Sequence, residues 1–210
     1  MCSIRNIIKF VTLICSLPTL GSCTVFAQTN TYGIYKTADD YSSNRLSFVF
    51  NCDEHKGKIR LYHFFGKKYI DIIQNRNQAR LSKDSIFGYR DCRQNDFRFY
   101  HNTVQEFRIV ENRSIIIYIA DVPITASTGK ARALVPAYYF STSLAGEIYP
   151  LTILNLKRAF PGNLKFHDQL DLAFGNGAQV STFDSEHKMF TVNFLLTQSL
   201  NNNKLINEHQ

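Results

Sequence analysis

The sequence predicts an α+β domain, in which an antiparallel β-meander is followed by two or three C-terminal helices packed on it. Between residues 33 and 143, apolar and polar residues alternate with a period of two, and many are β-branched or aromatic. This is the pattern of half-buried antiparallel strands. After Pro150 the apolar residues recur at helical spacing. Strands first and helices last indicate the α+β class, with the strands in a sheet, a sandwich or a partly closed barrel.

The alternation is clearest in the segments 58–65, 96–100, 106–110 and 114–119. Polar joints at residues 91–95 and 111–113 predict hairpins, the first of which joins residues 86–90 to the strand that follows. We therefore expect six to nine strands in a meander. A longer connection is expected between Pro123 and Pro136.

Three segments carry helix signals. Thr37, with Asp40 three residues later, predicts a capped short helix over residues 38–43. A helix is predicted over residues 151–160, and Asn163 is expected to cap another that ends at the glycines of 175–177. The apolar stripe of that helix consists of Phe166, Leu170, Ala173 and Phe174. Residues 184–196 fit both a helix and a strand, and we favour a helix that packs across the sheet.

Residues 28–200 are expected to fold as one domain, with 201–210 as a disordered polar tail. The side chains expected in the core are Ile59, Leu61, Phe97, Phe99, Ile115, Ile117, Leu154, Phe160, Leu170 and Phe174.

Residues 1–27 have the features of a secretory signal peptide. Arg5 and Lys9 precede an uncharged apolar run over residues 10–20, which is too short for a bilayer-spanning anchor. Small residues at Val25 and Ala27 predict cleavage after Ala27. We therefore expect export to the periplasm or cell envelope of a bacterium.

A lipid anchor is the alternative at the same place. Residues 20–23 resemble a bacterial lipobox, in which Cys23 would be lipidated and would attach the protein to a membrane surface. Cleavage after Ala27 is favoured because Gly21 is tolerated rather than preferred in a lipobox.

The mature chain is basic. The signal peptide holds two of the 24 Lys and Arg residues and none of the 17 acids, which leaves a formal charge of +5. These charges are dispersed along the chain and suit solvated strand faces. Because an exported protein rarely meets nucleic acid, we expect an envelope protein, a glycan or an anionic surface as the partner, and a membrane only if Cys23 is lipidated.

Only Cys52 and Cys92 lie beyond the signal peptide. In an oxidising compartment they can form a disulfide that closes a loop of about 40 residues, and two separately buried thiols are the alternative. Cys52 with His55, and Cys92 with His101, lack the tight knuckle spacing of a zinc site. We expect neither a metal nor a cofactor.

The histidines of the helical half lie near carboxylates. Asp184 and His187, three residues apart, can meet, whereas His167 and Asp168 diverge on a helix. No nucleophile motif or His-Glu-x-x-His pair accompanies them. We predict no catalytic residue, and His187, Asp184 and His167 come nearest to an acid–base set.

Arginine and aromatic residues interleave over residues 89–100. The glycine–aromatic core of an RNA-binding strand is absent, so aromatic–cation pairs across strands explain the pattern better. Because tyrosine and arginine often carry binding energy at interfaces, we expect Tyr89, Arg90, Arg98 and Tyr100 to form an exposed contact surface.

The chain also resembles an uncharacterised exported protein family of Bacteroidota. The resemblance lies in the runs GIYKTADDY (33–41), KDSIFGYRDC (83–92), YYFST (138–142), LNLKRAF (154–160), KFHD (165–168) and HKMF (187–190). It covers nearly the whole mature chain, and it implies export and one domain without adding an activity.

A signal peptide and a complete core without a reactive set of residues favour a non-enzymatic binding or scaffolding domain of the cell envelope. The alternative is an envelope hydrolase with an unrecognised His/carboxylate site.

Overall fold

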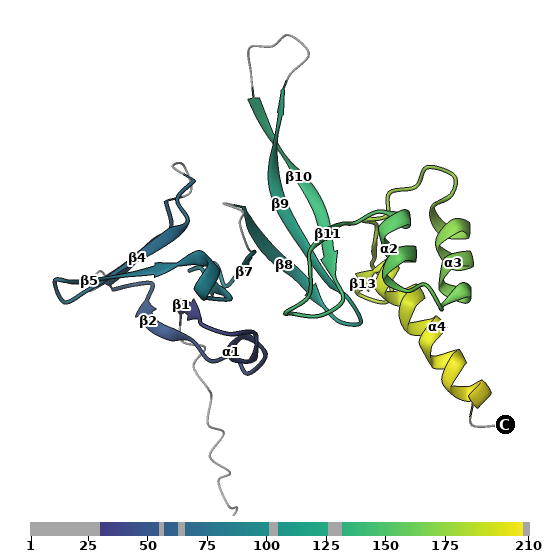
Figure 1. The fold of residues 1–210 in the computed structure, drawn as a ribbon, viewed down its shortest axis with the longest axis horizontal. Coiled ribbons are helices and arrows are strands. Elements are labelled where there is room, and N and C mark those ends of the chain that lie inside the picture. The colour runs from purple at the N-terminus through teal and green to yellow at the C-terminus, as the bar shows by residue number, and fades with distance from the viewer. Residues whose placement is uncertain (1–29, 55–56, 63–65, 101–104, 126–131, 208–210) are drawn as a thin grey trace, which may run out of the picture.

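The computed structural model describes residues 30–54, 57–62, 66–100, 105–125 and 132–207. Its largest element is an eight-stranded antiparallel sheet in the order β11-β10-β9-β8-β7-β6-β1-β2. Its strands are β1 Thr31–Tyr35, β2 Ser47–Asn51, β6 Gly88–Arg90, β7 Asp96–Phe99, β8 Glu106–Asn112, β9 Ile116–Thr125, β10 Arg132–Ser141 and β11 Tyr149–Pro150. From β6 to β11 the strands follow one another as a meander, and the β1–β2 hairpin extends the sheet beside β6 (Figure 1). The predicted α+β class is confirmed.

A second, three-stranded sheet is inserted between β2 and β6, and we call it the small sheet. It consists of β3 Gly57–Arg60, β4 Tyr69–Gln74 and β5 Asn77–Ser82, followed by the 3-10 turn η2 Lys83–Ser85. The sequence predicted a meander in a sheet, a sandwich or a partly closed barrel, and the structure has the small sheet packed on the eight-stranded sheet. Period-two alternation determines which side chains share a face, but it does not determine which strands are neighbours.

The local signals of the first half are confirmed. Helix α1 spans Ala38–Ser42, with the reciprocal Thr37 and Asp40 capping bonds that the sequence predicts. The β6–β7 and β8–β9 hairpins form at the expected joints.

The expected long connection between Pro123 and Pro136 is wrong, because β9 continues to Thr125 and β10 begins at Arg132. Among the described residues, β8 pairs with β9 only as far as Ile119, and β11 pairs with β10 only at Tyr139 and Phe140. The two prolines therefore lie where the outer edges of this hairpin have no partner strand, so a missing N–H costs no bond there.

Three helices follow the sheet, and we call residues 151–207 the helical lobe. Helix α2 spans Ile153–Ala159, α3 spans Leu164–Phe174 with the predicted Asn163 cap, and α4 spans Thr191–Asn207. The helix favoured for residues 184–196 is wrong in its first part, which forms a small hairpin of β12 Phe183–Asp184 and β13 Met189–Phe190. The expected tail also differs, since α4 continues through residues 201–207. No helix among the described residues has the length and apolar character needed to cross a bilayer.

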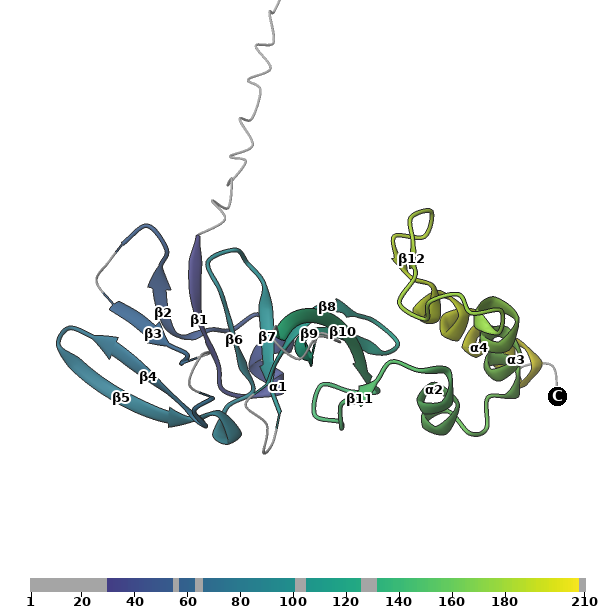
Figure 2. The same ribbon diagram turned by 90° about the horizontal axis from the view of Figure 1, so that it is seen from above.

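One face of the large sheet is covered at both ends. Cross-strand partners share a face, and the row Ile34, Tyr89, Phe97, Arg108, Ile119 and Tyr138 runs across β1, β6, β7, β8, β9 and β10. We call the face with this row the first face. Its β1–β6–β7 end packs on the small sheet, and its β9–β10 end packs on the helical lobe. Figure 2 shows the two covering layers at opposite ends of the molecule.

The second face carries a core of its own, which contains Phe107, Ile116, Tyr118 and Ala120. Of the predicted core, Phe99, Ile115, Ile117, Leu170 and Phe174 are buried, and Ile59, Leu61, Phe97 and Phe160 are partly buried. The prediction that Leu154 lies in the core is wrong, because 58% of Leu154 is exposed and Leu156 is fully buried instead. Two helical residues lie about 200° apart around the axis, so only one of this pair can face the sheet.

Candidate binding surfaces

The aromatic–arginine hairpin is not the exposed surface that the sequence predicts. Tyr89 is 3% exposed and Arg98 is 5% exposed. The Tyr89 ring stacks on Phe97 at 4.7 Å between centroids. The Arg98 guanidinium donates to the Tyr118 hydroxyl at 3.0 Å and to the Gly146 carbonyl at 2.7 Å. Both side chains are therefore part of the packing of the sheet.

Tyr89 belongs to a buried polar network that joins η2 to the large sheet. Glu106 accepts a hydrogen bond from the Tyr89 hydroxyl at 2.7 Å and forms an ion pair with Lys83 at 2.8 Å. Burial and the nearby Glu106 charge raise the pKa of Tyr89 far above its usual range. Because a buried polar group without a partner is costly, this network explains why a lysine and a tyrosine are tolerated between the two sheets.

The other two predicted contact residues are partly accessible. Tyr100 packs its ring edge against Phe107, with 6.2 Å between centroids. Arg90 forms a bidentate pair with Asp96, in which the two N···O distances are 2.8 Å and 2.9 Å. Arg90 and Asp96 also line a polar cavity on the second face.

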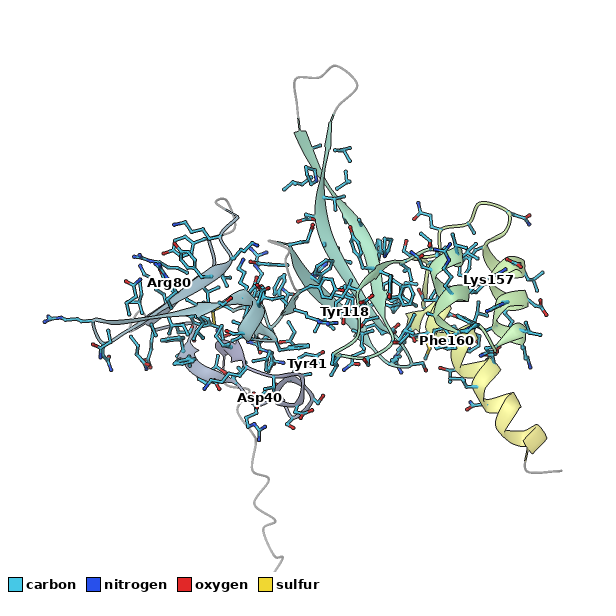
Figure 3. The ribbon with its side chains drawn as sticks, viewed as in Figure 1. Asp40, Tyr41, Arg80, Tyr118, Lys157 and Phe160 are labelled. Carbon is cyan, nitrogen blue, oxygen red and sulfur yellow. A yellow bond between two sulfur atoms is a disulfide. The ribbon has the colours of Figure 1, made fainter. Side chains whose placement is uncertain are left out.

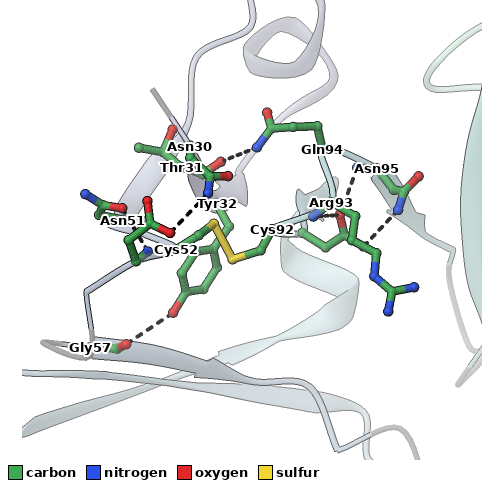
Figure 4. The surroundings of a disulfide bond; sticks show 12 residues. Asn30, Thr31, Tyr32, Asn51, Cys52, Gly57, Cys92, Arg93, Gln94 and Asn95 are labelled. Carbon is green, nitrogen blue, oxygen red and sulfur yellow. Dashed lines mark hydrogen bonds between the residues drawn. A yellow bond between two sulfur atoms is a disulfide. The ribbon is translucent and has the colours of Figure 1, made fainter. Parts of the chain in front are cut away.

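Cys52 and Cys92 form a disulfide, with 5.6 Å between their Cα atoms. The bond links the end of β2 to the turn between β6 and β7, and β1 lies between these strands (Figure 4). Beside it, the Gln94 side chain donates to the Thr31 carbonyl at 3.2 Å. Of the two alternatives, the structure therefore has the paired thiols, and such a bond persists in oxidising compartments.

Two of the three acid–base candidates, His187 and Asp184, contact each other. His187 Nδ1 lies 2.8 Å from Asp184 Oδ2, and the hydrogen bonds from the His187 backbone and ring lower the pKa of Asp184. His167 lies on α3 instead, where Nε2 contacts the Phe160 carbonyl at 2.9 Å. Neither histidine lines the polar cavity on the second face.

His55 and His101, which were weighed with Cys52 and Cys92 as zinc ligands and not favoured, lie outside the described residues. Within the part of the chain that the structure describes, no group of three or more His, Cys, Asp or Glu side chains is placed to hold a metal ion.

The outward side of the small sheet is basic and aromatic. Its inward side chains, among them Ile59, Ile70 and Ile72, pack on the large sheet, so their neighbours along each strand point away from the core. We call this outward side the basic face, and it comprises Lys58, Arg60, Tyr62, Lys67, Tyr69, Asp71 and Arg80. Figure 3 labels Arg80 at this end of the molecule.

Hydrogen bonds and ring contacts give the basic face a defined geometry. Asp71 lies between Arg60 on β3 and Arg80 on β5. Arg80 donates to it at 2.8 Å and 3.2 Å, and the Tyr62 hydroxyl donates at 2.5 Å. The Arg80 guanidinium lies 3.8 Å from the Tyr69 ring centroid, and Lys67 Nζ lies 4.6 Å from that of Tyr62. These contacts orient tyrosines and cations on one surface.

The net charge of residues 28–210 is concentrated in the segment that forms the small sheet. Residues 57–82 contain six cations and one acid, a formal charge of +5. The cations are Lys58, Arg60, Lys67, Lys68, Arg76 and Arg80, and all except the half-buried Lys67 are exposed. Four of the six, Lys58, Arg60, Lys67 and Arg80, belong to the basic face. The rest of residues 28–210 is therefore neutral. The sequence interpretation of dispersed charge missed this surface, because it considered consecutive basic residues, whereas a count over a window of about one hairpin length finds it.

No protein-family model, curated protein or solved structure matches this chain.

Proposed function

We propose that this protein is an exported, non-enzymatic binding domain of the bacterial cell envelope, which docks through its basic face on an anionic surface. The observation that carries the proposal is the charge distribution: the small sheet holds a charge of +5, the whole net charge of the mature chain. Packing on the large sheet uses only the opposite, apolar side of the small sheet. The cations are therefore available to a partner.

The composition of the basic face suits an anionic lipid surface. Basic residues held near such a surface contribute about 1 kcal/mol each. Among the cations Arg80 is partly neutralised by Asp71, whereas Arg60 has no carboxylate partner among the described residues. Tyr62 and Tyr69 add amphipathic rings, which are favoured where an apolar and a wet phase meet.

The proposed compartment rests on two expectations from the sequence and one contact in the structure. A signal peptide is expected over residues 1–27, a resemblance to exported proteins of Bacteroidota implies export, and Cys52 and Cys92 form a disulfide. Lipidation at Cys23, the alternative to cleavage after Ala27, would add a second attachment to the same surface.

Vesicle co-sedimentation tests the proposal. The mature chain is expected to bind vesicles that contain phosphatidylglycerol and to leave neutral phosphatidylcholine vesicles unbound, with binding that weakens as salt screens the charges. The variant Lys58→Gln/Arg60→Gln should partition about tenfold less strongly, or weaker still. Arg158→Gln/Lys165→Gln removes the same charge from the helical lobe and should bind as the wild type does. Equal losses in both variants would refute a specific role for the basic face.

The alternative, an envelope hydrolase, is favoured by one observation, the contact between His187 and Asp184. It requires that His187→Ala abolishes a hydrolytic activity measured on envelope extracts. On the binding proposal, this exposed substitution changes the free energy of unfolding by no more than about 0.5 kcal/mol and leaves vesicle binding unchanged.

A further inference from the structure

The second face of the large sheet contains an open cavity that is lined by polar side chains and one tyrosine ring. It has a volume of about 490 Å³, within the usual range of small-ligand sites. Its lining residues are Tyr41, Ser42, Asn44, Arg90, Gln94, Asp96 and Asn112. They come from α1 and the turn after it, from the β6–β7 hairpin and from the end of β8. Figure 3 labels Tyr41, on α1. No aliphatic side chain is among them.

The charges of this cavity neutralise each other. Arg90 donates through Nε and Nη2 to the two oxygens of Asp96, and through Nη1 to Asn44 Oδ1 at 2.7 Å. Asp96 also accepts a bond from the Tyr35 hydroxyl at 3.1 Å. A free anion would find the guanidinium already paired, and a free cation would find the carboxylate already paired. The cavity therefore favours a neutral ligand.

Two amide groups in the lining retain unused hydrogen-bonding capacity. Asn44 accepts through its Oδ1 atom, and Gln94 donates through Nε2 to the Thr31 carbonyl. Asn44 Nδ2 and Gln94 Oε1 have no hydrogen-bond partner among the described residues. The cavity therefore offers one hydrogen-bond donor, Asn44 Nδ2, and one acceptor, Gln94 Oε1. A hydroxyl group can pair with either atom, because it both donates and accepts.

Backbone conformation and ring packing give the lining a defined geometry without a ligand. Asn44 and Gln94 have φ angles of 51° and 61°, a left-handed conformation that is strained for most residues and is often found at ligand sites. The Tyr41 ring is fixed by stacking on Phe87 and by an edge contact with Tyr35, each with 5.3 Å between centroids. A preorganised site loses less entropy on binding.

From these features we infer that this cavity is a second binding site, which takes one unit of a neutral saccharide. Sugar hydroxyls match the free amide groups, and the apolar face of a sugar ring can pack on the Tyr41 ring. A peptide segment fits less well, because the lining offers no apolar pocket for its side chains. The site lies on the second face, away from the inward side of the small sheet, and does not depend on the basic face.

Saturation-transfer NMR with the mature chain tests the site. The probes are glucose, galactose, mannose, N-acetylglucosamine and N-acetylgalactosamine, each at millimolar concentration. At least one is expected to bind, and Asn44→Gly/Asn112→Ala is expected to weaken it by at least about tenfold. Asn75→Gly is the matched control, because Asn75 has a similar φ of 50° but lies in the β4–β5 turn. It should leave binding unchanged.

Two further arms keep the proposal falsifiable. Tyr41→Phe retains the ring and its packing and removes only the hydroxyl, which hydrogen-bonds to the Asn112 side chain. Because the ring is the proposed packing surface, this variant should still bind the sugar. Glucuronate should bind no more tightly than glucose, because the cavity offers no unpaired cation. The inference is overturned if none of the five sugars binds the wild type. It is also overturned if the Asn44→Gly/Asn112→Ala variant binds normally, or if Lys58→Gln/Arg60→Gln abolishes binding.

Discussion

The small sheet and the helical lobe cover the same face of the large sheet in different ways. The helical lobe buries a continuous apolar core, in which Leu156, Phe166, Leu170, Val192 and Leu196 are fully buried. The small sheet buries a smaller apolar side, and its end of the molecule also has the disulfide and the buried Lys83–Glu106 pair. Hydrophobic burial alone can hold the first arrangement, whereas the second combines burial with covalent and ionic links.

The outer surfaces differ as well. The helical lobe presents isolated exposed leucines, such as Leu154 and Leu172, which is normal for a soluble surface. The small sheet presents the basic face. The charged surface therefore lies on the small sheet, which is the covering layer with the smaller apolar core.

The largest expected loss of unfolding free energy comes from a substitution in the core of the helical lobe. Phe166→Ala removes a fully buried ring that packs edge-on against Phe160, and it should lower the free energy of unfolding by about 3–5 kcal/mol in urea titration. Leu172→Ala, on the same helix but 85% exposed, should change it by no more than about 0.5 kcal/mol. Similar losses in both variants would mean that α3 does not pack as described.

Removal of the disulfide should destabilise the end of the large sheet that packs on the small sheet. The Cys52→Ser/Cys92→Ser variant opens a link between residues 40 positions apart and should lose roughly 3–4 kcal/mol. Hydrogen exchange should show the loss of protection mainly in β1, β2 and β6, with α3 little affected. If α3 loses protection equally, the two ends unfold as one cooperative unit and the comparison fails.

A smaller effect is expected where the helical lobe is tied to the sheet. Asn193 is fully buried, and it accepts from the Ile115 N–H at 2.9 Å and donates to the Ile115 carbonyl at 3.0 Å and to Glu111 at 2.6 Å. Asn193→Ala leaves these groups unpaired and should cost about 2–3 kcal/mol. Asn201→Ala, at an exposed position of α4, serves as the control in the same urea titration and should be nearly neutral.

The smallest effect concerns the basic face and pH. Arg80 holds the pKa of Asp71 well below its usual range through hydrogen bonds. A carboxyl group whose pKa is depressed in the folded state stabilises fully above its unfolded pKa of about 3.9, and that stabilisation is lost as the pH falls further. The melting temperature of the wild type should therefore drop more than that of Asp71→Asn between pH 7 and about pH 2. Parallel curves would show that Asp71 is not a source of this dependence.

Local elements were predictable because their signals lie within a few residues. The α1 capping box joins Thr37 and Asp40, and the α3 stripe recurs at helical spacing behind the Asn163 cap. The β12–β13 hairpin was missed because its turn is short. There, the Asp184 carboxylate accepts from the backbone N–H groups of Glu186 and His187, and the helical apolar spacing of the following residues masked it.

Burial and charge grouping were predicted less well. The alternation of aromatic and arginine residues over 89–100 shows that the two kinds of side chain take opposite faces, but here both faces are covered. Tyr89 is buried against the small sheet and Arg98 beneath the segment that contains Gly146. A one-dimensional pattern does not indicate what covers a face. Two of the four expected contact residues, Tyr89 and Arg98, are therefore buried, whereas Arg90 and Tyr100 are partly accessible.

By itself, the sequence determined the fold class, the β6–β7 and β8–β9 hairpins, α1 and α3, because hydrophobic period and capping act between near neighbours. The two candidate binding surfaces, the basic face and the cavity on the second face, could be located only from the tertiary structure. Lys58 and Arg80 come onto one face when β3 and β5 pair with β4, and Tyr41, Arg90 and Asn112 meet when β1 inserts beside β6. Both surfaces depend on strand order, which is set by long-range packing and by the Cys52–Cys92 bond rather than by any local pattern.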